Sequence, residues 1–293
     1  MSFVILQSPS NLGLRPWGVE QLPAALQRAG LGAALGARDG GVIAPAAAYD
    51  AVRSQETGLL NGPGLRDTAR ALARAVAEVL QAGEVPIVLG GDCSVILGAL
   101  LGTRMAVGDR VGLLFIDGHV DFYQPEASPT GEVADMDLAL ATGRGPAILT
   151  ELNGPAPLVR DEDVAAVGAR DAGEREQAGA QDIRDTGITL LELPAVRERG
   201  IDAVAAQALD VVCAASRFWC HIDADVLDDT VMPAVDYRQP GGLTPDELTT
   251  LLRRAAQTGR MAGLSVAIYN PALDPKGDAA RVLVETIAGG LAG

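Results

Sequence analysis

The sequence has little positive charge and no long apolar run, and each of these absences excludes a class of protein. Its 293 residues include 38 acidic residues against 23 Lys and Arg, which gives a formal net charge of −15. Such an excess of negative charge argues against nucleic acid and against an anionic membrane as partners. No apolar stretch is long and unbroken enough to span a bilayer. We therefore expect neither a nucleic-acid-binding protein nor a membrane protein.

Cysteine is also scarce. Cys93, Cys213 and Cys220 are an odd number of thiols placed far apart, and a chain of this length buries a core without disulfide bonds. Residues 1–7 carry a short apolar run but lack the basic flank of a secretory signal. These features predict a protein of the reducing cytoplasm.

Short apolar runs alternate with helix-like stretches along the whole chain. The runs are mostly continuous in their apolar character, as expected for strands covered by helices on both faces. Expected strands are Phe3–Leu6, Pro86–Leu89, Gly112–Ile116, Asp163–Val167, Thr189–Leu193, Phe218–Ile222 and Gly263–Tyr269. Expected helices are Gly18–Gly30, Gly64–Ala82, Ser94–Gly102, Ile201–Ser216, Thr244–Gly259 and Asp278–Ala288.

This alternation predicts a parallel, doubly wound α/β sheet. No linker-like segment or internal repeat divides the chain, so we expect residues 1–293 to form one domain. Residues 122–160 are rich in Gly and Pro and weakly patterned. In an α/β protein such a segment is expected to be a functional loop near the site.

Acidic residues follow two of the apolar runs at alternate positions. Asp117, His119 and Asp121 follow one run, and Asp223 and Asp225 follow another. Alternate positions leave a strand on the same side, and a buried carboxylate is costly unless it is paired or binds a cation. Carboxylates with an imidazole suit a divalent first-row ion. One such cluster has the alternative of a solvated loop end, but two clusters favour a shared pair of cations, since packed carboxylates otherwise repel.

Two further features are more ambiguous. The segment Gly90-Gly91-Asp92-Cys93-Ser94 follows a third apolar run, and taken alone it favours a plain turn with a helix-capping Asp or Ser. The chain has only two histidines, and the second, His221, lies two residues before Asp223 on the same face of its strand. His221 sits deeper in the strand, where it either supports the ligands or is a core histidine.

In this order and spacing, residues 90–94, 117–121 and 223–228 resemble the three metal motifs of the arginase/agmatinase/formiminoglutamase (ureohydrolase) superfamily. The resemblance covers nearly the whole chain and includes residues 18–31, 241–244 and 269–271. It implies a three-layer αβα fold with a central, mostly parallel eight-stranded sheet. It also implies two divalent metal ions, typically manganese, bridged by hydroxide, together with a small-molecule substrate and a homo-oligomer, either a trimer or a hexamer.

The resemblance also assigns roles to individual residues. One metal would take Cys93, Asp117, Asp121 and Asp223, and the other would take Asp117, His119, Asp223 and Asp225, so that Asp117 and Asp223 bridge the pair. Asp121 would count among the catalytic residues as well. The bridging hydroxide would attack the carbon of a guanidinium, amidine or formimino group.

Several positions depart from the family pattern. Cys93 stands where arginase has a histidine, and a thiolate ligand widens the choice of metal to zinc, cobalt or iron. The family's proton-shuttling histidine would fall near Ala134, and Glu132 or Asp135 is the candidate general acid in its place. Ile268 stands where arginase has the glutamate that grips the guanidinium.

Asp171 and Glu174 resemble the region in which arginase holds the α-amino group of its substrate. The alternative for these two acids is an ordinary helix N-terminal turn.

These departures argue against ordinary arginase activity. The change of His to Cys resembles a branch that includes N-hydroxyarginine hydrolases. We therefore predict a hydrolase that cleaves a C–N bond of a linear guanidino, hydroxyguanidino or related amidine compound and releases urea or a urea analogue. The alternative is a metal-binding but catalytically inactive binding or regulatory protein. A metal-dependent deacetylase is a third possibility, although it would need more active-site histidines than this chain has.

Overall fold

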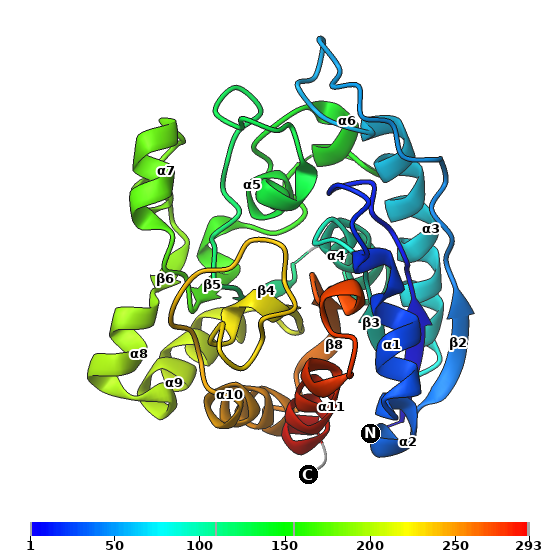
Figure 1. Cartoon of the computed structure of the whole chain (residues 1–293), viewed down its shortest axis with the longest axis vertical. Helices are drawn as coiled ribbons and strands as arrows, with labels where there is room; N and C mark the ends of the chain where they lie inside the picture. The colour runs from blue at the N-terminus through cyan, green and yellow to red at the C-terminus, as the bar shows by residue number, and fades with distance from the viewer. Residues whose placement is uncertain (1, 109, 155, 292–293) are drawn as a thin grey trace.

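The structure of the protein is a computed structural model in which residues 2–108, 110–154 and 156–291 are described. One sheet forms the middle of three layers, in the strand order β2-β1-β3-β8-β7-β4-β5-β6, and every strand pair is parallel (Figure 1). The strands are β1 Phe3–Gln7, β2 Arg38–Val42, β3 Val85–Leu89, β4 Gly112–Ile116, β5 Val164–Val167, β6 Thr189–Leu191, β7 Phe218–Asp223 and β8 Met261–Ala267.

Helices flank this sheet on both faces. The α-helices are α1 Leu22–Arg28, α2 Leu31–Leu35, α3 Gly62–Gln81, α4 Val95–Val107, α5 Asp137–Ala141, α6 Ala147–Thr150, α7 Ala172–Ala178, α8 Leu193–Arg199, α9 Ile201–Val212, α10 Pro245–Gln257 and α11 Asp278–Leu291. The 3-10 helices are η1 Val19–Gln21, η2 Val133–Asp135, η3 Asp161–Asp163, η4 Ile183–Asp185, η5 Ala224–Val226 and η6 Pro271–Leu273. None of the described helices is both long and apolar enough to cross a membrane.

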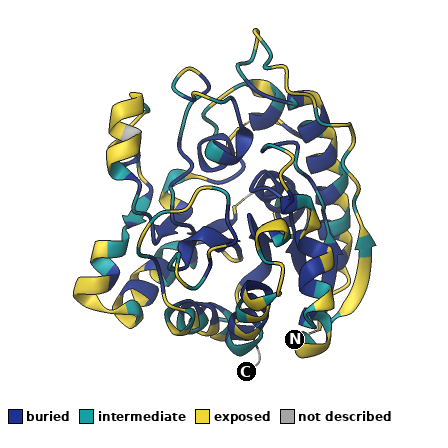
Figure 2. Cartoon of the chain, in the orientation of Figure 1, coloured by how far each residue is buried: buried dark blue, intermediate teal, exposed yellow. Residues whose placement is uncertain are grey.

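The apolar core divides into two clusters, one on each face of the sheet. Alternate residues of β1, β3 and β4 point to opposite clusters, as the pleat requires. Helices α3, α4 and α5 cover one face, and α1, α9, α10 and α11 cover the other. In Figure 2 the sheet is largely buried except for its edge strands β2 and β6, and the helices are exposed on their outer sides.

Close helix packing supports the first of these faces. Helices α3 and α4 lie against each other, and a Cβ atom on Gly102 of α4 would lie 2.5 Å from the carbonyl oxygen of Ala73 in α3. Glycine at this position therefore lets the two backbones approach closely. On the other face, α10 begins with a capping box in which Thr244 and Glu247 satisfy each other's backbone amides.

The predicted α/β sheet is confirmed, with corrections at its edge and boundaries. The strand β2 was missed because it is exposed and contains Gly40 and Gly41 in place of an apolar run. Strand β8 begins and ends two residues earlier than expected, which leaves Ile268 and Tyr269 beyond its end. Residues 122–160 were expected to be a loop but contain η2, α5 and α6.

The sheet order brings the three acidic motifs together. Strand β7 lies between β4 and β8, and β3 lies on the other side of β8. Phe115 pairs with His221, and Ile116 with Ile222, so the residues that follow β4 and those at the end of β7 emerge side by side. The carboxyl ends of these parallel strands form one edge of the sheet, where ligands bind in folds of this type.

Candidate metal centre and substrate cavity

The turn after β3 aims the thiol of Cys93 into the centre. Gly91 packs against the backbone of Ser10, and a Cβ atom at this position would lie 1.8 Å from the Ser10 carbonyl oxygen. The Asp92 carboxylate accepts hydrogen bonds from the amides of Gly13 at 3.0 Å and Ser94 at 2.9 Å. Asp92 therefore ties down the turn, and Cys93 Sγ is left to donate a hydrogen bond to Asp223 Oδ2 at 2.9 Å.

Two groups of possible metal ligands meet at the edge of the sheet. The ligand atoms of Cys93, Asp117, Asp121 and Asp223 all lie within 4.8 Å of one another, and the same holds for those of Asp117, His119 and Asp225. Asp117 belongs to both groups. This is close to the arrangement that the sequence predicts, except that the second group does not include Asp223.

The burial of these side chains fits a bound cation. The carboxylates of Asp117, Asp121, Asp223 and Asp225 are at most 8 % exposed, and Oδ2 of Asp117 has no hydrogen-bond partner within the described part of the chain. Asp121 takes a left-handed backbone conformation with φ 44°, which a non-glycine residue adopts only at a cost. A cluster of this kind is typical of a metal centre.

In the absence of a cation, the pKa values of most of the candidate ligands are raised. Burial raises the pKa of Asp117, Asp121 and Asp223, and neighbouring carboxylates raise it further. Burial likewise raises the pKa of the Cys93 thiol. Burial alone lowers the pKa of His119, but the Asp225 carboxylate, with Nδ1 of His119 2.9 Å from Oδ2, raises it to about 9.

We expect metal binding to release protons from this cluster. The raised pKa values favour the protonated forms of these groups, and a cation binds only their deprotonated forms, so the metal affinity should fall as the pH falls. Calorimetry of Mn²⁺ binding in buffers of different ionisation enthalpy measures the protons released. An identical binding enthalpy in all buffers would contradict the expectation.

A cavity of about 460 Å³ lies above the cluster. Its lining includes the ligand candidates His119, Asp121, Asp223 and Asp225. Besides Asp121, the other four residues that the sequence nominates for catalysis or substrate binding also line it, namely Glu132, Asp135, Asp171 and Glu174. The cavity lining does not include Cys93 or Asp117, which are buried beneath it.

The two candidate acids differ in their partners. Asp135 Oδ2 accepts hydrogen bonds from Ser128 Oγ at 3.0 Å and Thr130 Oγ1 at 3.2 Å, and burial raises the pKa of Asp135 to about 7. Glu132 forms an ion pair with Arg15 at 2.9 Å and accepts a hydrogen bond from Tyr237 Oη at 3.1 Å. Asp135 is therefore the better candidate for the general acid.

Both readings of Asp171 and Glu174 fit their positions. Asp171 immediately precedes α7 and Glu174 lies in its first turn, which is typical of a helix start. Asp171 is also buried, and its Oδ2 accepts a hydrogen bond from the amide of Val120 at 3.4 Å. Glu174 Oε1 accepts one from Gln239 Nε2 at 3.1 Å. The two carboxylates stand at one wall of the cavity.

Sequence reasoning missed Asp137, Arg15 and Tyr237. Asp137 is completely buried at the start of α5, and its ligand atom lies within 4.8 Å of those of Cys93 and His221. One signal was present, because Asp137 follows Asp135 at the same alternate spacing as the metal motifs. His221 is also completely buried, and burial lowers its pKa to about 3, so the imidazole is neutral. Neither Arg15 nor Tyr237 lies in a recognisable pattern.

Comparison with known proteins extends the match over the whole chain. The model of the arginase family matches residues 2–291. Arginase from Staphylococcus aureus (strain COL) is 28% identical over 291 residues, covering 97% of this chain and 94% of its own length. Arginase from Bacillus caldovelox is 30% identical over 286 residues, covering 96% of this chain and 94% of its own length. The native structure of the Bacillus caldovelox enzyme at pH 5.6 superposes with a TM-score of 0.90 at 30% identity, covering 100% of this chain and 98% of that chain.

Proposed function

Because the chain belongs to the arginase family, whose members use a binuclear metal centre, we propose that it hydrolyses a C–N bond of a linear hydroxyguanidino, guanidino or related amidine compound and releases urea or a urea analogue. The observation that carries the proposal is the pair of ligand groups that share Asp117 beneath a cavity of about 460 Å³. The cavity is large enough for a small molecule and is lined by carboxylates that suit a cationic substrate.

We propose Cys93, Asp117, Asp121 and Asp223 as ligands of one ion, with Asp117, His119, Asp223 and Asp225 as ligands of the other. When bound, a pair of divalent cations supplies an activated water and a Lewis acid for the substrate. Manganese is the ion that the family resemblance suggests. Zinc, cobalt and iron are the alternatives, because the thiolate of Cys93 is a softer ligand than imidazole.

The substrate preference follows from the walls of the cavity. Ile268 contributes an apolar side chain, which cannot pair with a full guanidinium charge. N-hydroxylation lowers the basicity of a guanidine, so a hydroxyguanidine suits such a wall better than arginine does. At another wall, Asp171 and Glu174 present carboxylates that suit the cationic amino group of an amino-acid substrate.

Asp135 is the proposed general acid. Its pKa of about 7 lets it hold a proton near neutral pH and deliver it to the leaving amine. The hydroxyl groups of Ser128 and Thr130 fix the orientation of the carboxyl. Glu132 is held by Arg15 and Tyr237, and we assign it a positioning role in the wall of the cavity.

We also propose a single-domain, cytoplasmic protein that forms a homo-oligomer, either a trimer or a hexamer. Three cysteines without disulfide bonds support a reducing compartment. The assembly rests on the family resemblance, and light scattering of the purified protein measures it.

The test is metal content followed by turnover. We expect purified protein incubated with Mn²⁺ to hold about two equivalents per chain by elemental analysis. The loaded protein should then release hydroxyurea from N-hydroxyguanidino compounds faster than it releases urea from the matching guanidino compounds. Two bound ions without turnover of any guanidino or amidine compound would contradict the hydrolase and favour the binding protein.

A further inference from the structure

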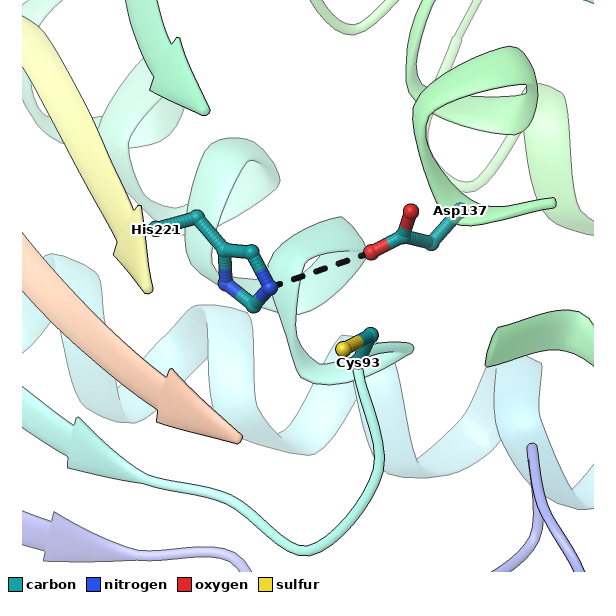
Figure 3. Close-up of side chains that lie close together, drawn as sticks. All are labelled: Cys93, Asp137 and His221. Carbon is teal, nitrogen blue, oxygen red and sulfur yellow. Dashed lines mark ion pairs between the residues drawn. The ribbon is translucent and has the colours of Figure 1, made fainter. Parts of the chain in front are cut away.

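Three buried side chains, those of Cys93, Asp137 and His221, lie close together in the structure (Figure 3). Cys93 comes from the turn after β3, Asp137 from the start of α5 and His221 from β7. Their ligand atoms all lie within 4.8 Å of one another, and each side chain is completely buried. Only Cys93 belongs to the two ligand groups already described.

The facing atoms of this group lack hydrogen-bond partners. Among the described residues, no side chain hydrogen-bonds to either carboxylate oxygen of Asp137 or to Nε2 of His221, and the carboxylate has only a weak contact with the neighbouring amide of Leu138. His221 Nε2 lies 4.0 Å from Asp137 Oδ2, which is too long for a hydrogen bond. A buried carboxylate and a buried imidazole nitrogen left in this state are strongly destabilising, and a ligand between them would satisfy both.

His221 is oriented to offer Nε2 to such a ligand. Its Nδ1 lies 2.7 Å from Ser265 Oγ, which also accepts a hydrogen bond from Trp219 Nε1 at 2.9 Å. A hydroxyl oxygen has two acceptor lone pairs, so Ser265 can accept from both rings. With its proton on Nδ1, the imidazole has a free lone pair on Nε2, and a hydrogen bond of this kind is how metal-binding histidines are usually oriented.

We propose that Cys93, Asp137 and His221 hold a third metal ion, one that Zn²⁺ or Co²⁺ fills in preference to Mn²⁺. Thiolate, imidazole and carboxylate are the ligands that zinc takes in proteins, whereas manganese favours oxygen. The inference rests on the proposed function for the two outer ions, since Cys93 is also a proposed ligand of one of them.

The charges of the cluster support a third cation. The three ligand groups together contain five carboxylates and the thiol of Cys93. When all are ionised, two divalent ions offset four of these six charges, and a third divalent ion offsets the rest. The carboxylates of Asp92, Asp121, Asp135 and Asp223 act on Asp137, and each of them repels the ionised form of Asp137.

The third ion would fix the wall of the substrate cavity. Asp137 begins α5, and the preceding residues 132–135 carry both Glu132 and Asp135. A metal that joins Asp137 to β7 and to the turn after β3 therefore anchors these two side chains above the outer ions. Asp137 and His221 are positioning residues in this role, because neither lines the cavity.

The test adds Co²⁺ to the Mn²⁺-loaded full-length protein. We expect about one equivalent of Co²⁺ to bind while about two equivalents of Mn²⁺ remain, with a thiolate-to-cobalt absorption band in the near ultraviolet. Excess Zn²⁺ should remove this band and displace the Co²⁺ without displacing Mn²⁺.

Two variants locate the ion. Asp137→Asn keeps the shape of the side chain, and His221→Asn keeps a donor near Ser265 while removing the Nε2 atom. Each should bind about two equivalents of Mn²⁺ and lose the additional Co²⁺ together with its band. Cys220→Ser is the matched control, because this buried thiol neighbours His221 on β7 and lies outside every ligand group.

The possible failures are distinguishable. If the native protein binds two Mn²⁺ and takes up no additional Co²⁺, or if Co²⁺ merely replaces Mn²⁺, the third site is overturned and the proposed function stands. If both variants still bind the additional Co²⁺, the site is likewise overturned. If the native protein binds no Mn²⁺, the proposed function fails. The Zn²⁺ competition uses the native protein, so the result does not depend on the variants folding.

Discussion

Asp223→Asn is expected to remove at least one of the two outer metal ions and, with it, nearly all hydrolysis. Oδ2 of Asp223 contacts the thiol of Cys93, and Oδ1 accepts a hydrogen bond from the Asp225 amide at 2.7 Å. An asparagine lacks the negative charge needed to hold a cation beside three other acids. We expect the metal affinity to fall by more than ~100-fold, the upper range for residues that only orient a ligand.

Elemental analysis of the desalted variant measures this loss, and turnover is then measured at saturating Mn²⁺. Asp228→Asn is the matched control, because Asp228 lies in the same motif but accepts hydrogen bonds from Thr230 and belongs to none of the ligand groups. Unchanged metal content in Asp223→Asn would disprove the ligand assignment.

Asp135→Asn should keep both outer metal ions but lower kcat by about 10²–10⁴-fold, the usual contribution of a general acid. The pKa of Asp135 is raised to about 7, so the carboxyl is protonated below that pH and loses its proton above it. A general acid acts in its protonated form. The kcat of the native protein should therefore fall as the pH rises through this pKa. Bound cations shift the pKa of Asp135 downward. In Asp135→Asn the fall of kcat at alkaline pH should disappear.

Glu132→Gln provides the comparison for Asp135→Asn. Glu132 lines the same cavity but is already paired with Arg15, so its replacement should lower kcat much less and leave the pH profile intact. Steady-state measurement of kcat against pH for both variants separates the two roles. A larger loss in Glu132→Gln, or an unchanged alkaline limb in Asp135→Asn, would reverse the assignment.

Much of the fold was readable because buried parallel strands are continuously apolar. Gly112–Ile116 is the clearest case, since the observed β4 has the predicted bounds and every residue is buried. The same signal is absent from β2, an exposed edge strand that is stabilised by pairing with β1 and contains no apolar run. Chain pairing of this kind depends on tertiary structure and leaves little trace in local sequence.

Part of the metal centre could also be predicted from the sequence, because some of its ligands follow a local pattern. Alternation along a single strand, as in Asp117, His119 and Asp121, is a local pattern that survives in the sequence. The nearness of Asp137 to His221 arises only in the folded chain, because the two residues lie more than eighty positions apart in the sequence. The orientation of Cys93 likewise depends on Ser10 and Gly13 holding the turn.

The strand order has a consequence for biosynthesis. Strands β3 and β4 are consecutive in the chain but are separated in the sheet by β8 and β7, the last two strands to leave the ribosome. Before β7 and β8 are made, only the neighbours β2-β1-β3 and β4-β5-β6 have their partners available, and Cys93 follows a strand of the first set while Asp117 follows a strand of the second. The insertion of β7 and β8 joins the two sets and delivers Asp223 and Asp225 in the same step. A nascent chain therefore has no complete site with which to capture a metal, and metal loading becomes a late event that follows synthesis of residues 218–267.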